Sequence, residues 1–347
     1  MKTPKYRAGT RNKMKIDFEH RQSAHCENGA TAGLISHYGV EMSEAMAFGI
    51  GAGLFFGYIP FIRLNNLPLT TFRIAAGSIF KKVSRELGVK YKARRFRDQE
   101  QAMRVLDETI AEGIPVGLQT GAWWLPYFPD AYRFHFNMHN LVVFGKEGDN
   151  YLISDPVFPE PVVCASDDLR KARFAKGALA PKGKMYCLEE VPAQIDFPKA
   201  IKSGIRSATK AMLKYPLPII GISGIHFLAK RLEIWPAKLG EEKALLYLGQ
   251  LIRMQEEIGT GGAGFRFIYA AFLQESAAHL EDDRFGEFSQ RMTDIGDRWR
   301  EFAVRAARNC KGRAGADDSF PAMARILMEI ADTEEKLYID LAEAVAS

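Results

Sequence analysis

The chain has 347 residues, of which 47% are hydrophobic and 26% are charged, and its formal net charge is +5. This is the composition of an ordinary soluble globular protein, and the length predicts two domains with enough residues for a core in each. So mild a positive charge does not by itself indicate nucleic-acid binding.

Cysteine usage and the N-terminal segment both predict a cytoplasmic protein. Cys26, Cys164, Cys187 and Cys310 are far apart and show no Cys-x-x-Cys or Cys/His metal spacing. We therefore expect free thiols in a reducing compartment, with neither a disulfide framework nor a metal site. Residues 1–20 lack the apolar core of a signal peptide, and no stretch approaches the roughly 18 apolar residues that span a bilayer.

The first helix of the chain carries a cysteine at its start. Residues 1–19 are expected to form a loose basic arm, and the segment from Cys26 reads as a short helix that ends at Gly39. A helix N-terminus carries partial positive charge and unpaired N–H groups, which favour the thiolate of a nucleophilic cysteine. The alternative is a buried, inert cysteine that opens a core helix.

The next elements are a helix capped by Ser43, a glycine-rich segment, a strand over residues 55–59 and a helix over residues 71–87. The glycine-rich segment, residues 49–53, is expected either to line a channel beside the Cys26 helix or to form a tight packing turn.

A basic stretch follows, in which residues 81–97 hold eight lysines and arginines against one acid, Glu86. Such a run forms a solvated face or a docking surface for an acidic partner, and no nucleic-acid-binding motif accompanies it. The residues assigned to docking are Lys81, Lys82, Arg94, Arg95 and Arg97.

Residues 98–129 predict a helix, a strand and an aromatic loop. Asp98 caps a helix that runs to about residue 112, and a strand covers residues 114–119. The loop contains Trp123, Trp124 and Tyr127, which are expected to line a binding cleft or to fold back onto the core.

A β-rich block comes next. Strands are expected over residues 134–144, 151–154, 161–164 and 184–188, with a hairpin turn over residues 145–150. A helix begins near Ser166.

The rest of the chain is predicted to be almost entirely helical. The expected helices cover residues 199–215, 225–233, 241–258, 265–280, 285–307 and 321–346. We therefore predict an α+β N-terminal domain over residues 20–195 and a mainly helical domain over residues 196–347.

The β block offers a base and an orienting acid for Cys26. His139 opens one strand and Asp155 ends the next across the hairpin, so the two are expected to be cross-strand partners. A carboxylate of this kind holds a histidine in one tautomer, and a cysteine nucleophile needs such a base. His135 is the rival base, because period-2 alternation places it on the same face as His139. The order Cys, His, Asp is the papain-like order.

These motifs resemble the butirosin biosynthesis protein H N-terminal family and the helical domain that follows it. The matching N-terminal residues are His25-Cys26-Glu27, His37-Tyr38-Gly39, Ser43-Glu44-Ala45, Gly49-Ile50-Gly51, Leu125-Pro126-Tyr127, and His139 with Val142-Val143-Phe144-Gly145. The matching C-terminal residues are Gly259-Thr260-Gly261-Gly262-Ala263-Gly264-Phe265-Arg266 and Phe272-Leu273-Gln274-Glu275.

The resemblance implies a papain-like fold, with the Cys26 helix packed on an antiparallel sheet, used for acyl transfer. The family's namesake moves an aminoacyl group from an acyl carrier protein to an aminoglycoside amine. Family members often carry an acid shortly before Leu-Pro-Tyr, where this chain has Gln119-Thr120-Gly121, which argues against an aminoglycoside acceptor here.

The motif Gly259–Gly264 formally fits the dinucleotide pattern GxGxxG, but it follows a helix rather than a strand, so we reject nucleotide binding. We expect a close helix–helix turn that lets the next helix, with Arg266, approach the cleft. Arg266 and Glu275 could contact substrate or form ordinary ion pairs.

The sequence thus predicts a cytoplasmic acyltransferase that carries an acyl group on Cys26, with His139 as base and Asp155 as its orienting acid. Backbone N–H groups at Glu27, with Gln22, would bind the oxyanion. The substrate-binding residues are expected to be Glu44, Trp123, Trp124, Tyr127, Arg266 and Glu275.

The expected donor is an acyl carrier protein, whose phosphopantetheine delivers the substrate, and the expected acceptor is a small-molecule amine. No other cofactor, metal or nucleic acid is expected. The alternatives are a cysteine peptidase, amidase or thioesterase with the same triad, and a non-catalytic binding protein on this fold. The acyl group, the acceptor and the oligomeric state, a homodimer included, stay open.

Overall fold

A computed structural model describes residues 13–64, 66–130, 133 and 135–346 of the chain. The chain divides into two compact units. The first contains Met1–Ala47 and Ile79–Ile195, and the second contains Phe48–Ser78 and Asp196–Ser347. Residues 48–78, which the sequence predicts to belong to the first domain, lie in the helical unit.

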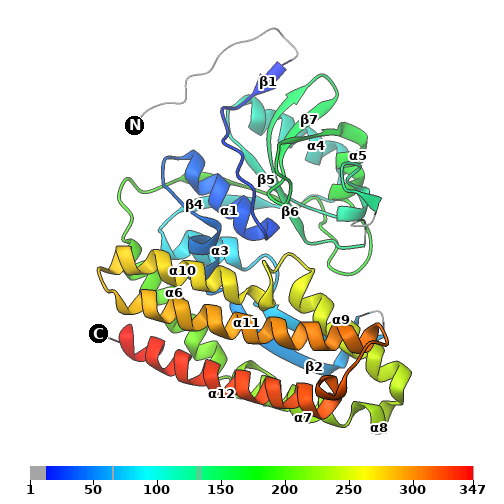
Figure 1. Cartoon of the computed structure of the whole chain (residues 1–347). Helices are drawn as coiled ribbons and strands as arrows, with labels where there is room; N and C mark the ends of the chain where they lie inside the picture. The colour runs from blue at the N-terminus through cyan, green and yellow to red at the C-terminus, as the bar shows by residue number, and fades with distance from the viewer. Residues whose placement is uncertain (1–12, 65, 131–132, 134, 347) are drawn as a thin grey trace. The chain divides into compact units, whose positions relative to one another are not determined.

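The first unit is built on an antiparallel sheet with strand order β4-β9-β5-β6-β7-β8, in which β1 also pairs with β6 (Figure 1). The strands are β1 (Lys13–Lys15), β4 (Lys90–Arg94), β5 (Val116–Thr120), β6 (His139–Glu147), β7 (Asn150–Ser154), β8 (Val162–Ala165) and β9 (Met185–Glu190). The helices are α1 (Cys26–His37), α2 (Glu44–Ile50), α3 (Ile79–Glu86), α4 (Gln99–Ala111) and α5 (Ser166–Arg173), of which α2 runs across the division between the units.

Helices α1 and α4 pack against the central strands β5 and β6. Strand β5 is buried at every position, and β6 is buried over its first seven residues. Their side chains Leu118, Leu141 and Val143 join Ile153 and Leu169 in one hydrophobic core. The site residues carried by α1, β6 and the end of β7 are therefore held by a packed core rather than by free loops.

Glycine at position 29 lets α1 approach the segment that follows β7. A Cβ atom on Gly29 would lie 2.5 Å from Pro156 Cβ and 2.7 Å from Ser23 Cβ, closer than any real contact of this kind. The backbone N–H of Ser23 donates to the carbonyl of Pro156 at 2.6 Å. The start of α1 is thus fastened to the residue that follows Asp155.

The second unit combines a hairpin with a helical array. The hairpin is β2 (Leu54–Leu64) and β3 (Leu67–Arg73). The helices are α6 (Phe197–Leu213), α7 (Gly221–Glu233), α8 (Trp235–Leu239), α9 (Glu241–Glu256), α10 (Arg266–Leu280), α11 (Arg284–Cys310) and α12 (Phe320–Ala344). Figure 1 shows the long helices α10, α11 and α12 running beside one another.

The glycine-rich segment before β2 is a packing device inside this second unit. A Cβ atom on Gly49 would lie 2.1 Å from the ring of Phe272, and one on Gly204 would lie 2.4 Å from the carbonyl oxygen of Gly49. Of the two expectations for residues 49–53, a channel lining or a tight packing turn, the contacts support the packing turn.

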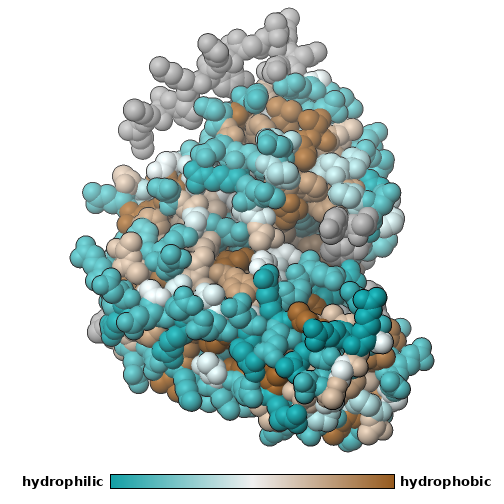
Figure 2. Space-filling model, in the orientation of Figure 1, coloured by the Kyte–Doolittle hydropathy of each residue, from teal (hydrophilic) through white to brown (hydrophobic). Residues whose placement is uncertain are grey.

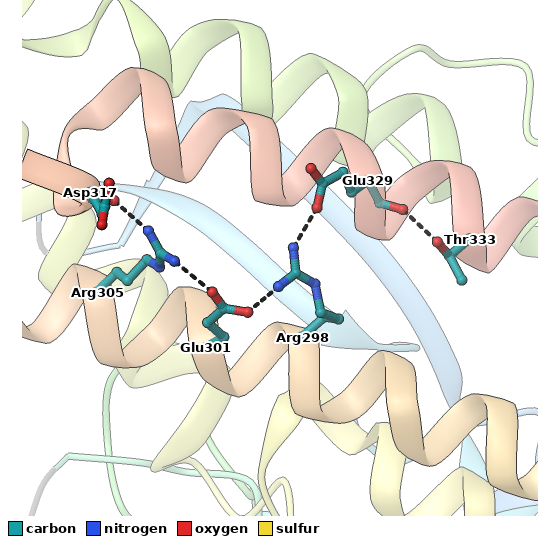
Figure 3. Close-up of polar contacts among 6 residues, drawn as sticks. All are labelled: Arg298, Glu301, Arg305, Asp317, Glu329 and Thr333. Carbon is teal, nitrogen blue, oxygen red and sulfur yellow. Dashed lines mark hydrogen bonds and ion pairs between the residues drawn. The ribbon is translucent and has the colours of Figure 1, made fainter.

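Polar contacts join α11 to α12 on the surface of the second unit (Figure 3). Arg305 donates to the Glu301 carboxylate at 2.7 Å and to the carbonyl of Asp317, in the short helix η4 (Ala316–Asp318), at 2.5 Å. Arg298 links Glu301 with Glu329 of α12. Exposed pairs of this kind contribute about 0–1 kcal/mol each, so the buried face holds the unit together. Figure 2 shows that the visible surface of the molecule is mainly hydrophilic, with scattered apolar patches.

The predicted fold class is confirmed: a cysteine-bearing helix packs on an antiparallel sheet, and a mainly helical unit follows. The helix expected over residues 71–87 is wrong in its first half, because β3 runs to Arg73 with alternating burial and α3 starts only at Ile79. The basic arm is also wrong in part: Lys13–Lys15 pair with β6, while residues 1–12 lie outside the described residues.

Two further predictions were imprecise. The hairpin turn expected over residues 145–150 contains only Gly148 and Asp149, because β6 continues to Glu147. The basic stretch contains the unpredicted strand β4, which pairs with β9 through cross-strand partners such as Lys92 and Cys187. No helix of the described residues is long and apolar enough to cross a membrane.

Candidate active site

Cys26 is the first residue of α1, as predicted. The N-cap is His25, whose Nδ1 accepts the N–H of Asn28 at 3.4 Å, and the helix ends before Gly39, which adopts a positive φ of 87°. The thiol is buried, with 6% of the residue exposed. Its position places it at the positive end of the helix, where N–H groups have no partner within the helix.

His139 and Asp155 form a buried pair. His139 Nε2 lies 2.7 Å from Asp155 Oδ2, with 4% of the histidine and 0% of the aspartate exposed. His139 faces Thr120 of β5, and Val142 faces Ser154 of β7. The sequence predicts that the two residues lie directly opposite each other. Asp155 instead reaches His139 diagonally. The predicted contact itself is present.

Cys26 lies close enough to His139 to act on its pKa, through its charge and as a side-chain hydrogen-bond partner. Burial alone would disfavour the imidazolium, but the Asp155 carboxylate and Cys26 outweigh it and raise the pKa of His139 to about 10. With Nε2 on Asp155, Nδ1 is the ring nitrogen available to the thiol. Cys26 and Asp155 thus both act on one imidazole, an arrangement that favours the imidazolium form of His139.

Tyr127 completes the environment of Asp155. Its hydroxyl donates to Asp155 Oδ2 at 2.8 Å, and the N–H of Val157 donates to Oδ1 at 3.3 Å. Burial, followed by the neighbouring carboxylate, raises the pKa of Tyr127 well above its usual value, so the phenol remains a neutral donor. The ring of Phe128 meets His139 edge-on at 5.1 Å. Tyr127, expected to line a binding cleft or to fold back onto the core, therefore contacts Asp155.

Glu44 holds the backbone that precedes Cys26. Its Oε2 accepts the N–H of Ala24 at 2.9 Å, and its Oε1 accepts the N–H of His25 at 2.7 Å. Burial raises the pKa of Glu44, while these hydrogen bonds oppose the rise. Both oxygens thus hold the backbone that precedes Cys26, and the contact of Glu44 with substrate stays a prediction.

The two predicted oxyanion residues differ in their surroundings. Glu27 is 1% exposed, and its side chain accepts the N–H of Ile79 at 2.9 Å, which ties α1 to the start of α3. Its backbone N–H belongs to the first turn of α1. Gln22 is exposed, in the loop before the helix.

His135 is separated from this network. It is exposed and stacks on Trp123, with ring centroids 4.5 Å apart. Trp123 and Trp124, in the short helix η1 (Ala122–Trp124), are 40% and 42% exposed. The geometry therefore favours His139 over His135 as the partner of Cys26 and leaves both tryptophans at the surface.

Arg266 was predicted to approach the cleft, but its charge is satisfied within the second unit. Its Nε and Nη2 donate to the two carboxylate oxygens of Glu334 at 2.9 and 3.0 Å, and Nη1 donates to the carbonyl of Gly264 at 2.8 Å. The residue is 0% exposed, as is Glu334. Of the two predicted roles of Arg266, substrate contact or ion pairing, the structure shows the ion pair. Glu275, on the same helix, is partly exposed and also has an interaction partner.

The predicted docking residues lie on α3 and around β4. Four of them are exposed, and Lys82 is half-buried, which lowers its pKa. The exposed residues are Lys81, Arg94, Arg95 and Arg97. Within the described part of the chain, no cluster of three or more His, Cys, Asp or Glu side chains could hold a metal ion.

A buried thiol, imidazole and carboxylate in series at a helix N-terminus define a cysteine–histidine–aspartate site on an α+β fold. Residues 25–156 match the family model described as butirosin biosynthesis protein H, N-terminal, and residues 167–341 match the model described as domain of unknown function (DUF4872). The second match spans about half of the chain, so the protein belongs to the DUF4872 family, with an N-terminal region of the butirosin biosynthesis protein H family.

The chain also resembles a solved structure, the crystal structure of a Bacillus anthracis protein described as a putative C39-like peptidase. The two are 14% identical, the match covers 51% of this chain and 98% of the other, and the TM-score is 0.37. A likeness of this size says nothing about the activity. No curated protein matches the sequence.

Proposed function

We propose that the protein is a cysteine-dependent acyltransferase that moves an acyl or aminoacyl group from an acyl carrier protein to an amine, in the biosynthesis of an antibiotic or related metabolite. The observation that carries the proposal is the buried series Cys26, His139 and Asp155 at the N-terminus of α1. The match of residues 25–156 to a family named for butirosin biosynthesis supports the reaction class.

The first half of the reaction forms an acyl-enzyme. The Cys26 thiolate attacks the thioester carbonyl, and the oxyanion that develops faces N–H groups of the first turn of α1, such as that of Glu27. Collapse of the tetrahedral intermediate breaks the bond to the carrier sulfur. The His139 imidazolium gives its proton to that leaving thiolate.

The second half transfers the acyl group to the acceptor. The amine attacks the Cys26 thioester, and His139, now neutral, accepts the amine proton while Cys26 leaves as the thiolate. The Asp155 carboxylate keeps the ring oriented throughout and stabilises the imidazolium. No metal or further cofactor takes part in this scheme.

Hydrolysis by the same three groups is the rival reaction, and the fate of the acyl group separates the two. Purified protein is given an acyl-loaded carrier with and without a panel of amines, and the products are quantified. We expect amide to exceed free acid when a suitable amine is present, and both to vanish in Cys26→Ala. Free acid as the sole product, whatever amine is supplied, would establish a hydrolase instead.

A further inference from the structure

A second site lies in the first unit, outside the cysteine–histidine–aspartate series. It is an open cavity of about 410 Å³. Its wall includes the apolar side chains of Phe96, Phe174 and Ala175, and three cations, Arg97, Lys176 and Lys182, also line it. We call this cavity the basic pocket.

The cations of the basic pocket carry uncompensated charge. Arg97, Lys176 and Lys182 are all exposed, and within the described residues none of their side chains has an ion-pair or hydrogen-bond partner. The described lining contains no acidic residue. Elsewhere on this sheet edge the lysines are paired, as Lys90 is with Glu190 at 2.7 Å. A group of free cations around an apolar wall fits a ligand that joins an anion to an apolar body.

The wall of the pocket is fastened to the strand end that carries His139. Asn137, two residues before His139, donates through Nδ2 to the carbonyls of Lys176 and Ala178 at 3.1 and 2.9 Å. A Cβ atom on Gly121 would lie 2.5 Å from Ala175 Cβ, so β5 ends in close contact with the same wall. The wall of the pocket therefore contacts the residue after β5 and the residue two before His139 of β6.

Positive charge continues from the pocket toward the start of α1. The register of β4 and β9 pairs Arg94 with Met185, which brings the next residues, Arg95 and Lys184, opposite each other. Burial lowers the pKa of Lys184, and Arg95 lowers it further, while Glu27 beside Cys26 raises it. Lys184, two residues from Lys182 of the pocket, is thus within electrostatic range of Glu27, the residue that follows Cys26.

We propose that the basic pocket binds the phosphate end of a phosphopantetheine arm, with the arm lying along its apolar wall so that the thioester is presented to Cys26. This inference rests on the proposed function for its choice of ligand. The ammonium groups of Lys176 and Lys182 would attract the phosphate as point charges, and the guanidinium of Arg97 would donate hydrogen bonds to it. A carrier protein and coenzyme A both provide this arm, and the shared chemistry is the phosphate with its pantetheine chain.

Equilibrium binding of the free ligand tests the pocket without any turnover. Phosphopantetheine and pantetheine, which differ only in the phosphate, are titrated into Cys26→Ala protein. We expect phosphopantetheine to bind at least about tenfold more tightly, and the difference to shrink as ionic strength rises. Equal affinities, or binding of neither compound, would overturn the inference.

Variants locate the effect in the pocket. Lys176→Gln/Lys182→Gln removes two of its cations, and Lys210→Gln/Lys336→Gln removes two exposed charges from α6 and α12 of the other unit. We expect the preference for phosphopantetheine to disappear in the first variant and to persist in the second. Equal loss in both would show a general charge effect and contradict the assignment.

Acylation of Cys26 then separates this inference from the proposed function and identifies the source of the arm. The donors are acyl-carrier, acyl-coenzyme A and the acyl thioester of N-acetylcysteamine, which lacks the phosphate. In the pocket variant we expect the rate with the phosphate-bearing donors to fall at least tenfold and the N-acetylcysteamine rate to stay unchanged. Loss with all three donors refutes the pocket. If no donor acylates Cys26, the proposed acyl transfer fails, and the binding titration still decides the pocket.

Discussion

Replacing Asp155 by asparagine removes the charge that holds His139 as an imidazolium while leaving the shape of the site nearly unchanged. His139 has a pKa of about 10 against an ordinary value of 6.5, and at 1.4 kcal/mol per tenfold this corresponds to roughly 5 kcal/mol in favour of the charged ring. Asp155 is the largest of the favourable causes.

An asparagine cannot satisfy the same partners. Asp155 Oδ2 meets His139 Nε2 and accepts from the Tyr127 hydroxyl, while Oδ1 accepts the N–H of Val157. An amide whose oxygen takes the place of Oδ2 points its NH₂ at the N–H of Val157. The reverse orientation points the NH₂ at the protonated Nε2 of His139. In either orientation one donor faces another. We expect acyl transfer to fall by about 10²- to 10⁴-fold, as in other triads that lose the carboxylate charge.

The assay is the rate of Cys26 alkylation by iodoacetamide as a function of pH. Because the folded pKa of His139 lies above its ordinary value, the imidazolium is present below about pH 10 and is lost above it. The wild type should therefore react rapidly already at pH 6–7. Asp155→Asn should react slowly there and gain rate only near the ordinary thiol pKa of about 8.5. Superimposable profiles for the two proteins would refute the charge-pair reasoning.

Three further changes have definite expected outcomes. Tyr127→Phe deletes the hydroxyl on Asp155, and we expect a smaller loss of acylation, about 3- to 30-fold, with thermal stability lowered by about 1 kcal/mol; a loss as large as that of Asp155→Asn would contradict a supporting role. Gly29→Ala places a Cβ atom 2.5 Å from Pro156, so the melting temperature should fall by several degrees, and an unchanged value would show that α1 can move freely. Arg266→Met leaves the buried Glu334 carboxylate without its cation, so unfolding should require about 3–5 kcal/mol less; full stability with impaired binding of the acceptor would restore a substrate role for Arg266.

The place of Cys26 at a helix start and the contact between His139 and Asp155 could be predicted because their signals are local. Cys26 lies before an apolar-periodic segment with a glycine stop, and His139 and Asp155 flank a hairpin whose composition is unambiguous. The helices of the second unit were also predictable, since helical periodicity is read within one segment. The hydrogen-bond partners of Asp155 could not be predicted, because Tyr127 reaches Asp155 only after a loop folds back on the sheet.

The errors occurred where tertiary contacts override a local pattern. Residues 71–73 carry helix-compatible side chains, but pairing with β2 draws them into β3, and Phe72 is 2% exposed. Glu44, predicted to contact substrate, accepts the N–H groups of Ala24 and His25. Arg266, for which the sequence leaves substrate contact and ion pairing open, pairs with Glu334. The basic pocket has no sequence signature, since its lining comes from residues 96–97 and 174–182.

The most direct test of the central claim is the intact mass of the protein after brief incubation with an acyl-loaded carrier protein in the absence of an amine. Wild type and Cys310→Ala, in which an exposed cysteine is removed, should each gain the mass of one acyl group, and peptide mapping should place it on Cys26. Cys26→Ala should gain nothing. An unmodified wild type, or an equal adduct on Cys26→Ala, would contradict a covalent acyl-enzyme at this site.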